Sequence, residues 1–180
     1  TIGNAATSEG VFWETVNAAG VKQLPVVISI WDDGYGISVP NEIQTTKGDI
    51  SAVLRGFQED EAGQGFEIFR VKGWDYAGLC EVYEKAAELA RNESKPCLIH
   101  VVEMTQPQGH STSGSHERYK SHERLEWETE FDCNKKMRDW LIDSGMATDE
   151  ELAAIDSEAK DFVRKEQKRA WADYRKTLQV

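Results

Sequence analysis

An uncharged run of seven residues, from Pro25 to Trp31, constrains the fold of this chain more than any other feature. The run, Pro-Val-Val-Ile-Ser-Ile-Trp, is rich in β-branched side chains, which is typical of a strand buried on both faces of a parallel sheet. Apolar residues recur at helical spacing from Glu9 to Gln23, and Thr7 or Ser8 is expected to cap that helix. Because Thr1 to Gly3 resembles the last step of an earlier strand, we predict that the chain begins with a strand–helix–strand unit whose strands are parallel.

The remaining segments predict a fold of the α/β class, in which a parallel sheet is flanked by helices and followed by a helical C-terminal tail. The expected elements are a loop over Asp32 to Asp49, a short helix around Ile50 to Glu59, strands over Phe66 to Val71 and Pro96 to Glu103, a helix over Asp75 to Asn92, and one tail helix over Leu125 to Asp143 that Gly145 ends. Thr148 to Glu151 has the pattern of a capping box, which begins a final helix. Thr105 to Ser121 is polar and rich in Gly, Ser and His, and so long a loop inside a compact domain is more often functional than not.

The composition excludes several classes of partner and location. Lys and Arg number 21 against 32 Asp and Glu, so the formal net charge is −11, and neither nucleic acid nor an anionic membrane is an expected partner. The longest apolar run, Leu24 to Trp31, is too short to span a bilayer. Cys80, Cys97 and Cys133 are an odd number at wide spacings without a CxxC pair, which predicts free thiols in a reducing compartment.

The start of the chain predicts that the natural protein is longer. A domain rarely begins inside its own sheet, yet Thr1 to Gly3 resembles the end of a strand. We therefore expect residues 1–121 to be the C-terminal part of an α/β domain whose N-terminal part lies upstream. Residues 122–180 are expected to form a helical tail that packs on that domain or on a partner.

Two segments predict a ligand site when they are taken together. Gly3 to Gly10 is a turn of small residues between a strand and a helix, where unpaired backbone N–H groups attract phosphate. Asp32 and Asp33 follow the next strand, and in an open parallel sheet ligands bind outside the carboxyl ends of the strands. Carboxylates there are hard oxygen donors that suit magnesium. Either segment alone would be interpreted as an ordinary turn with solvated polar side chains.

The pair resembles the thiamin-diphosphate motif, in which Gly-Asp-Gly is followed, after a helix and a strand, by Asn-Asn. In that family the aspartate and the last asparagine bind magnesium together with a backbone carbonyl two residues later. The resemblance implies that Asn4, Asp33 and the carbonyl of Tyr35 bind the metal, and that Asn4, Ala5, Ala6 and Asp33 bind the cofactor. Amide and carboxylate have exchanged places relative to the motif, so the charge offered to the metal is unchanged.

The resemblance extends, in order, over essentially the whole chain. Glu9 to Glu14, Asp33 to Ser38, Val71 to Asp75 and Gly145 to Ile155 look like the α subunit, or α-like half, of the dehydrogenase component of pyruvate and branched-chain 2-oxo acid dehydrogenase complexes. The resemblance implies a thiamin-diphosphate-binding fold with thiamin diphosphate and Mg²⁺ as cofactors. It also implies an oxidoreductase of a multienzyme complex, which decarboxylates a 2-oxo acid oxidatively and transfers the acyl group to lipoyl-lysine.

The same resemblance implies two partners. One is the β subunit or β domain of the same enzyme, which in the family supplies the glutamate that activates the aminopyrimidine of the cofactor. The other is the lipoyl domain of an acyltransferase component. The assembly would be a homo- or hetero-oligomer, located in the cytoplasm or, in a eukaryote, in the mitochondrial matrix. Because this chain offers no candidate for the activating glutamate, the chain by itself is expected to be inactive.

Gly109 to Ser113, with Arg118 to Ser121, looks like the mobile active-site loop of the family, and we expect the loop to become ordered only with cofactor and partner present. The resemblance implies that His110 lies by the cofactor diphosphate and is catalytic in transfer to the lipoyl group; a loop imidazole can donate a proton near neutral pH. Ser111 matches a serine that is phosphorylated in mitochondrial relatives. Gln106 replaces an arginine that the family usually places near the diphosphate.

Two other interpretations stay open. The first is a different thiamin-diphosphate enzyme such as transketolase, although the His-Ser-Thr-Ser loop and the C-terminal helices argue against it. The second is a noncatalytic assembly module with a decayed cofactor site, because Asn4 and Gln106 both depart from the family pattern. His100, in a predicted buried strand, is expected to be a hydrogen-bonded core residue. The other histidines are spaced by six residues, which does not suit a zinc site.

Overall fold

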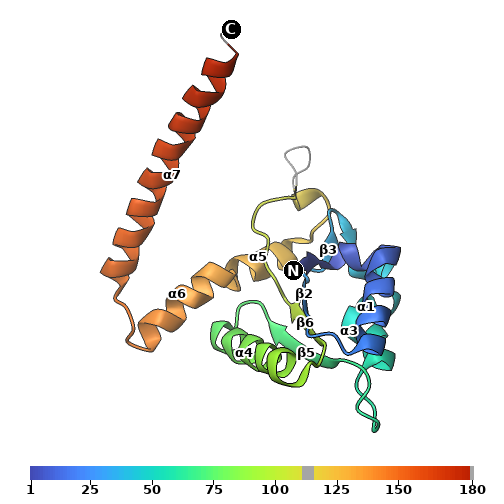
Figure 1. The fold of residues 1–180 in the computed structure, drawn as a ribbon. Coiled ribbons are helices and arrows are strands. Elements are labelled where there is room, and N and C mark those ends of the chain that lie inside the picture. The colour runs from blue at the N-terminus through green and yellow to red at the C-terminus, as the bar shows by residue number, and fades with distance from the viewer. Residues whose placement is uncertain (111–115, 179–180) are drawn as a thin grey trace. The chain divides into compact units, whose positions relative to one another are not determined.

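The computed structural model describes residues 1–110 and 116–178 of the chain (Figure 1). Its internal contacts divide the chain into two compact units, Thr1–Met137 and Arg138–Val180. The first unit contains the sheet and the candidate site. The second contains the end of helix α6 (Cys133–Asp143) and the whole of helix α7 (Asp149–Thr177).

A four-stranded parallel sheet forms the centre of the first unit (Figure 1). The strands stand in the order β1 (Ile2–Gly3), β2 (Val27–Trp31), β6 (Cys97–Val102) and β5 (Glu67–Lys72), and every neighbouring pair is parallel. β6 is buried along its whole length, as expected of a strand covered on both faces. The predicted strand–helix–strand unit is confirmed, because β1 pairs in parallel with β2 across the intervening helix α1 (Gly10–Lys22).

Helices cover both faces of this sheet, as neighbouring residues of β6 show. Leu98 belongs to a core cluster with Phe12 of α1, whereas Ile99 belongs to a second cluster with Ala86 of helix α4 (Tyr76–Glu93). Because successive residues of a strand point to opposite faces, α1 and α4 lie on opposite sides of the sheet (Figure 1). The α/β class and the two long helices predicted from the sequence are therefore confirmed.

The segment between β2 and the next core helix is more structured than the predicted loop. It contains the short strands β3 (Tyr35–Gly36) and β4 (Val39–Pro40), which pair in an antiparallel hairpin. The helical turn α2 (Asn41–Gln44) and the 3₁₀ turn η2 (Thr46–Gly48) follow. The loop prediction over Asp32 to Asp49 was wrong in this respect, because its Gly, Pro and Asn residues shape tight turns that hydrogen-bond locally.

Short helical turns also stand at two other places. The predicted short helix is present as α3 (Ile50–Val53) followed by the 3₁₀ turn η3 (Leu54–Phe57). The predicted cap of α1 was wrong, because the 3₁₀ helix η1 (Asn4–Ser8) comes between β1 and α1 and Glu9 takes the N-cap position. The hydroxyl of Thr7 donates to the first carbonyl of that 3₁₀ helix at 2.6 Å, so it closes η1 and does not cap α1.

The tail forms two helices where the sequence predicted one. Helix α5 (His122–Glu130) has Phe131 as its C-cap, and α6 begins after Asp132. The carboxylate of Asp132 accepts the backbone N–H of Lys135 at 2.9 Å, which is the hydrogen bond of a new N-cap. The single tail helix was therefore a wrong prediction, because Asp132 favours a new helix start over continuation.

Helix α7 begins as the sequence predicted. The side chain of Thr148 accepts the backbone N–H of Glu151 at 3.2 Å, and the Glu151 carboxylate accepts the backbone N–H of Thr148 at 2.9 Å, which completes the capping box. Arg138, at the start of the same unit, binds Asp149 at 2.7 Å. Within the ranges that the structure describes, no helix has an apolar stretch long enough to cross a membrane.

A buried ion pair fixes α5 in the first unit. Lys120 Nζ lies 2.8 and 2.9 Å from the two carboxylate oxygens of Glu128, and both side chains are only 2% exposed. Arg124 Nε donates to the same carboxylate at 2.9 Å, while its Nη2 donates to the backbone carbonyl of Asp33 at 2.7 Å. Glu128 thus neutralises one buried cation and orients a second, and the second holds the turn that follows β2.

We predict that Glu128→Ala lowers the free energy of unfolding by about 3–5 kcal/mol, because it removes the carboxylate that is hydrogen-bonded to the buried Lys120 ammonium. Urea denaturation of the complete protein, followed by near-UV circular dichroism, measures this. Glu126→Ala is the matched control on the same helix: its side chain is 68% exposed and pairs with the exposed His122, so the loss should stay below about 1 kcal/mol. Equal effects of the two substitutions would show that the buried pair does not stabilise α5.

Candidate functional site

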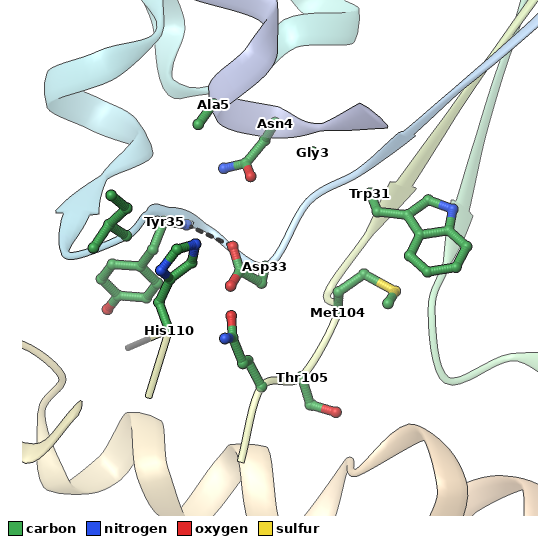
Figure 2. Close-up of a pocket in the computed structure, with 11 residues that line it drawn as sticks. Gly3, Asn4, Ala5, Trp31, Asp33, Tyr35, Met104, Thr105 and His110 are labelled. Carbon is green, nitrogen blue, oxygen red and sulfur yellow. Dashed lines mark hydrogen bonds between the residues drawn. The ribbon is translucent and has the colours of Figure 1, made fainter. Parts of the chain in front are cut away.

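A pocket of about 350 Å³ opens where three parallel strands end (Figure 2). Gly3 ends β1, Trp31 ends β2, Met104 follows β6, and all three line the pocket. The carboxyl edge of an open parallel sheet is the usual place for a ligand in this class of fold. The position of the pocket therefore agrees with the prediction from the sequence.

Most of the residues singled out from the sequence meet in this pocket. Asn4, Ala5, Asp33, Tyr35 and His110 all line it, although they come from three separate segments of the chain. Gln106 lines it too. Ala6 does not: it lines a different pocket, between β1 and α1. The segment 111–115, which includes Ser111 and part of the predicted mobile loop, lies outside the described residues.

Asp33 presents its carboxylate to the pocket. Its Oδ1 accepts the backbone N–H of Tyr35 at 3.1 Å (Figure 2). Its backbone carbonyl accepts from Arg124. Burial raises the pKa of Asp33 above its ordinary value, and the Tyr35 N–H and the charge of Lys120 offset this only in part. A cation in the pocket would favour the ionised form of this carboxylate.

Asp32 has the opposite environment, although it is the neighbouring residue. Its side chain points into the protein, where it accepts hydrogen bonds from the backbone N–H of Gly34 at 2.8 Å, from Asn41 Nδ2 at 2.8 and 3.0 Å, and from His100 Nε2 at 2.9 Å. Burial alone raises the pKa of Asp32, but the hydrogen bonds from His100, Asn41 and Gly34 outweigh it and hold the pKa below its ordinary value. Only one of the two adjacent carboxylates therefore serves the pocket.

His100 is the hydrogen-bonded core residue that the sequence predicted. It is buried in β6, and its Nδ1 lies 3.0 Å from the hydroxyl of Ser51 while Nε2 binds Asp32. Ser51 in turn donates to Asp49 at 2.7 Å. The polar groups of this buried chain are thus paired, as buried polar groups in folded proteins are.

Asn4 is the polar residue on the opposite side of the pocket from β6. It is 6% exposed, and its Nδ2 donates to Asn41 Oδ1 at 2.8 Å. Figure 2 shows its side chain turned toward Asp33 across the pocket. Sequence reasoning missed Asn41, because its partner Asn4 lies 37 residues away and no local pattern joins the two.

Close packing at Gly36 brings the hairpin to η1. A Cβ atom on Gly36 would lie 3.2 Å from the methyl group of Ala5 and would collide with the side-chain oxygen of Gln44. The next residue, Ile37, has a φ of 61°, which is unusual for a β-branched side chain and costs of the order of 1–3 kcal/mol. Both features keep the hairpin close to the mouth of the pocket, which Ile37 also lines.

A cationic and aromatic flank lies beside Tyr35. It contains Tyr119 and Lys120, which belong to the predicted active-site loop, and Arg124, which sequence reasoning missed. The Tyr35 ring lies edge-on to Tyr119 at 5.6 Å between centroids, with Lys120 Nζ at 5.2 Å and the Arg124 guanidinium at 5.6 Å from its centroid. Lys120 and Arg124 are both bound to Glu128. Neither cation is therefore unpaired and available to replace the arginine that the resemblance expects at position 106, near the diphosphate.

The donors of the pocket suit a hard cation. Among the described residues, no three His, Cys, Asp or Glu side chains gather as a metal-binding group. Asp33 offers a carboxylate and Asn4 an amide oxygen, and Tyr35 lines the same pocket. Carboxylate and carbonyl oxygens with room for water or phosphate oxygens are the ligands that magnesium prefers, so the residues present fit Mg²⁺.

Comparison with known proteins agrees with the geometry. Residues 1–179 match the family described as "Dehydrogenase E1 component". The mitochondrial 2-oxoisovalerate dehydrogenase subunit alpha 1 of Arabidopsis thaliana is 30% identical over 161 residues, which cover 88% of this chain and 32% of the relative. The pyruvate dehydrogenase E1 component subunit alpha of Rickettsia conorii is 28% identical over 165 residues, and that of Rhizobium meliloti is 25% identical over 162.

These alignments cover 91% and 89% of this chain but only 47% and 44% of the two bacterial relatives. The chain therefore spans less than half the length of the curated relatives that it matches. The family match nevertheless extends over almost every residue, and the resemblance to E1 α subunits is confirmed. This chain belongs to the dehydrogenase E1 component family.

Proposed function

We propose that this chain is the part of a 2-oxo acid dehydrogenase that anchors the magnesium and diphosphate end of thiamin diphosphate. One observation carries the proposal: Asn4, Asp33 and Tyr35, taken from the ends of two strands on the basis of the family motif, line one pocket together with His110. Nothing in the local sequence requires these segments to meet. Their meeting at the carboxyl edge of a parallel sheet is what a diphosphate site of this type needs.

Each residue has a separate task in this proposal. Asp33 supplies the negative charge to the cation, Asn4 supplies a neutral amide oxygen, and the backbone carbonyl of Tyr35 is the third protein ligand. Ala5, whose side chain is small, lets the phosphate approach the backbone at the start of η1. His110 stands at the same pocket and would donate a hydrogen bond to the diphosphate or to a reacting group.

The cofactor would supply the carbanion chemistry, while the protein supplies binding, orientation and electrostatics. The reaction we propose for the complete protein is oxidative decarboxylation of a 2-oxo acid with transfer of the acyl group to a lipoyl-lysine. The relatives with pyruvate dehydrogenase and 2-oxoisovalerate dehydrogenase in their names support this class of substrate. A β subunit or β domain and a lipoyl domain are the proposed partners, and the cytoplasm or the mitochondrial matrix is the proposed location.

A cofactor-free assembly module is the competing function, and Gln106 is the observation that favours it. Gln106 lines the pocket where the family usually has a cation, and the nearby Lys120 is paired with Glu128. Binding of thiamin diphosphate to the complete protein decides between the two. A protein that binds the cofactor in a magnesium-dependent way is the enzyme component, and one that binds neither ligand is the module.

We predict that Asp33→Ala weakens magnesium-dependent binding of thiamin diphosphate by more than about 100-fold, because losing a residue that only supports a metal ligand already costs about 10- to 100-fold. Isothermal titration of the complete protein with thiamin diphosphate, with and without Mg²⁺, measures the loss. Asp161→Ala is the control, since that carboxylate is 76% exposed on α7. Unchanged affinity in Asp33→Ala would refute the metal assignment.

A further prediction concerns the 180-residue chain by itself. It should turn over no 2-oxo acid, because the glutamate expected to activate the aminopyrimidine belongs to the β portion. A decarboxylation assay with pyruvate and with branched 2-oxo acids, in excess thiamin diphosphate and Mg²⁺, tests this. The complete protein together with the β portion should turn over a 2-oxo acid, and turnover by the 180-residue chain alone would contradict the division of roles.

A further inference from the structure

Three buried side chains link the interior of the sheet to the proposed cation site. Asp32 binds Asn41, and Asn41 binds Asn4. We infer that Asp32, acting through Asn41, holds the Asn4 amide with its oxygen toward the cation. This inference rests on the proposed function. It makes Asp32 and Asn41 positioning residues for a metal ligand, and Asn41 has no counterpart among the residues predicted from the sequence.

The direction of the first hydrogen bond is set by chemistry. An ionised carboxylate can only accept hydrogen bonds. Asn41 must therefore turn its NH₂ group toward Asp32, and its Nδ2 lies 2.8 and 3.0 Å from the two carboxylate oxygens. Asp32 is itself held by the backbone N–H of Gly34 and by His100 Nε2, so the carboxylate cannot rotate away.

The second hydrogen bond inherits this direction. With its NH₂ group on Asp32, Asn41 has only its oxygen to offer to Asn4, and an oxygen accepts. Asn4 must then donate through Nδ2, which lies 2.8 Å from Asn41 Oδ1. The oxygen of Asn4 is the end that remains for the pocket. The negative charge on Asp32 thus fixes the orientation of the Asn41 amide, and the Asn41 amide fixes the orientation of the Asn4 amide.

This orientation matters because an amide is nearly symmetrical in shape but not in charge. If Asn4 were rotated by half a turn, its NH₂ group would face the cation and repel it. A carboxylate at the same position would need no such control, since both of its ends accept. Asn4 is 6% exposed and Asn41 is 8% exposed, so water cannot easily take over the role of either partner.

A double-mutant cycle tests this chain of hydrogen bonds from Asp32 through Asn41 to Asn4, which we call the relay. Asn41→Leu removes both hydrogen bonds at nearly constant volume, and Asn4→Asp replaces the metal ligand by a group whose orientation does not matter. The cycle compares the unchanged complete protein, the two single variants and the double variant. The measured quantity is the Mg²⁺ concentration needed for half-maximal binding of thiamin diphosphate. Binding of Mn²⁺ by electron paramagnetic resonance and the thermal midpoint without ligands are measured alongside. Asn41→Ala is the second variant at that position.

The relay makes the effect of Asn41→Leu depend on residue 4. With Asn4 present, the substitution should weaken Mg²⁺ binding about tenfold, as for other groups that orient a metal ligand. In the Asn4→Asp protein it should change Mg²⁺ binding by less than about twofold, because independent sites add to within that margin. Asn41→Leu should lower the thermal midpoint in both backgrounds, because it removes a donor from the buried Asp32 carboxylate, whereas its effect on Mg²⁺ binding should depend on residue 4.

Equal weakening in both backgrounds would overturn the relay, because Asn41 would then be only a structural residue. An unchanged Mg²⁺ affinity of Asn41→Leu with Asn4 present would overturn it as well. Asp33→Ala separates this failure from failure of the metal site. If Asp33→Ala abolishes Mg²⁺ binding while the cycle shows no dependence on residue 4, the proposed site stands and the relay falls. If Asp33→Ala changes nothing, both fall.

Discussion

The buried carboxylate of Asp32 is the interaction on which the geometry of the sheet edge depends. It follows β2, binds His100 of β6, accepts the N–H of Gly34 in the turn and holds Asn41 at the start of α2. Strand β6 and the segment from Asp32 to Asn41 are thereby joined at one group. A buried charge is costly unless its hydrogen-bonding capacity is filled, and here every donor reaches it at 3.0 Å or less. Asp32 thus holds together the segments that form the pocket, although its own side chain does not line the pocket.

Two adjacent aspartates have different tasks because the turn after β2 directs their side chains to different places. Asp32 points inward and Asp33 points into the pocket, and their environments move the two pKa values in opposite directions. If both carboxylates faced the pocket, they would repel each other, and in the absence of a cation this repulsion would disfavour the ionised form of both. The division leaves one charge for the ligand and uses the other for structure. This explains how the turn keeps a net charge of one at the pocket despite its two acidic residues.

Much of the fold followed from patterns that are local. The strand from Pro25 to Trp31, the helix that became α4 and the capping box at Thr148 each depend on residues a few positions apart, and each was confirmed. The errors came where a distant or competing contact decides. Thr7 closes a 3₁₀ turn and caps nothing, and Asp132 starts a new helix where apolar spacing predicted continuation. Propensity is a weak prior in such places, because tertiary contacts override it.

The candidate site could be predicted as a set of residues but not as a network. A family pattern marks Asn4, Asp33 and Tyr35, and the structure brings them to one pocket. The family pattern does not mark Asn41, because Asn41 is needed only where an amide at position 4 and a carboxylate at position 33 have exchanged places. A carboxylate at position 4 would be a ligand in either orientation, whereas an amide there requires a partner that fixes its direction. The departure of this chain from the family pattern and the presence of a buried Asn41 between Asp32 and Asn4 are therefore two parts of one arrangement.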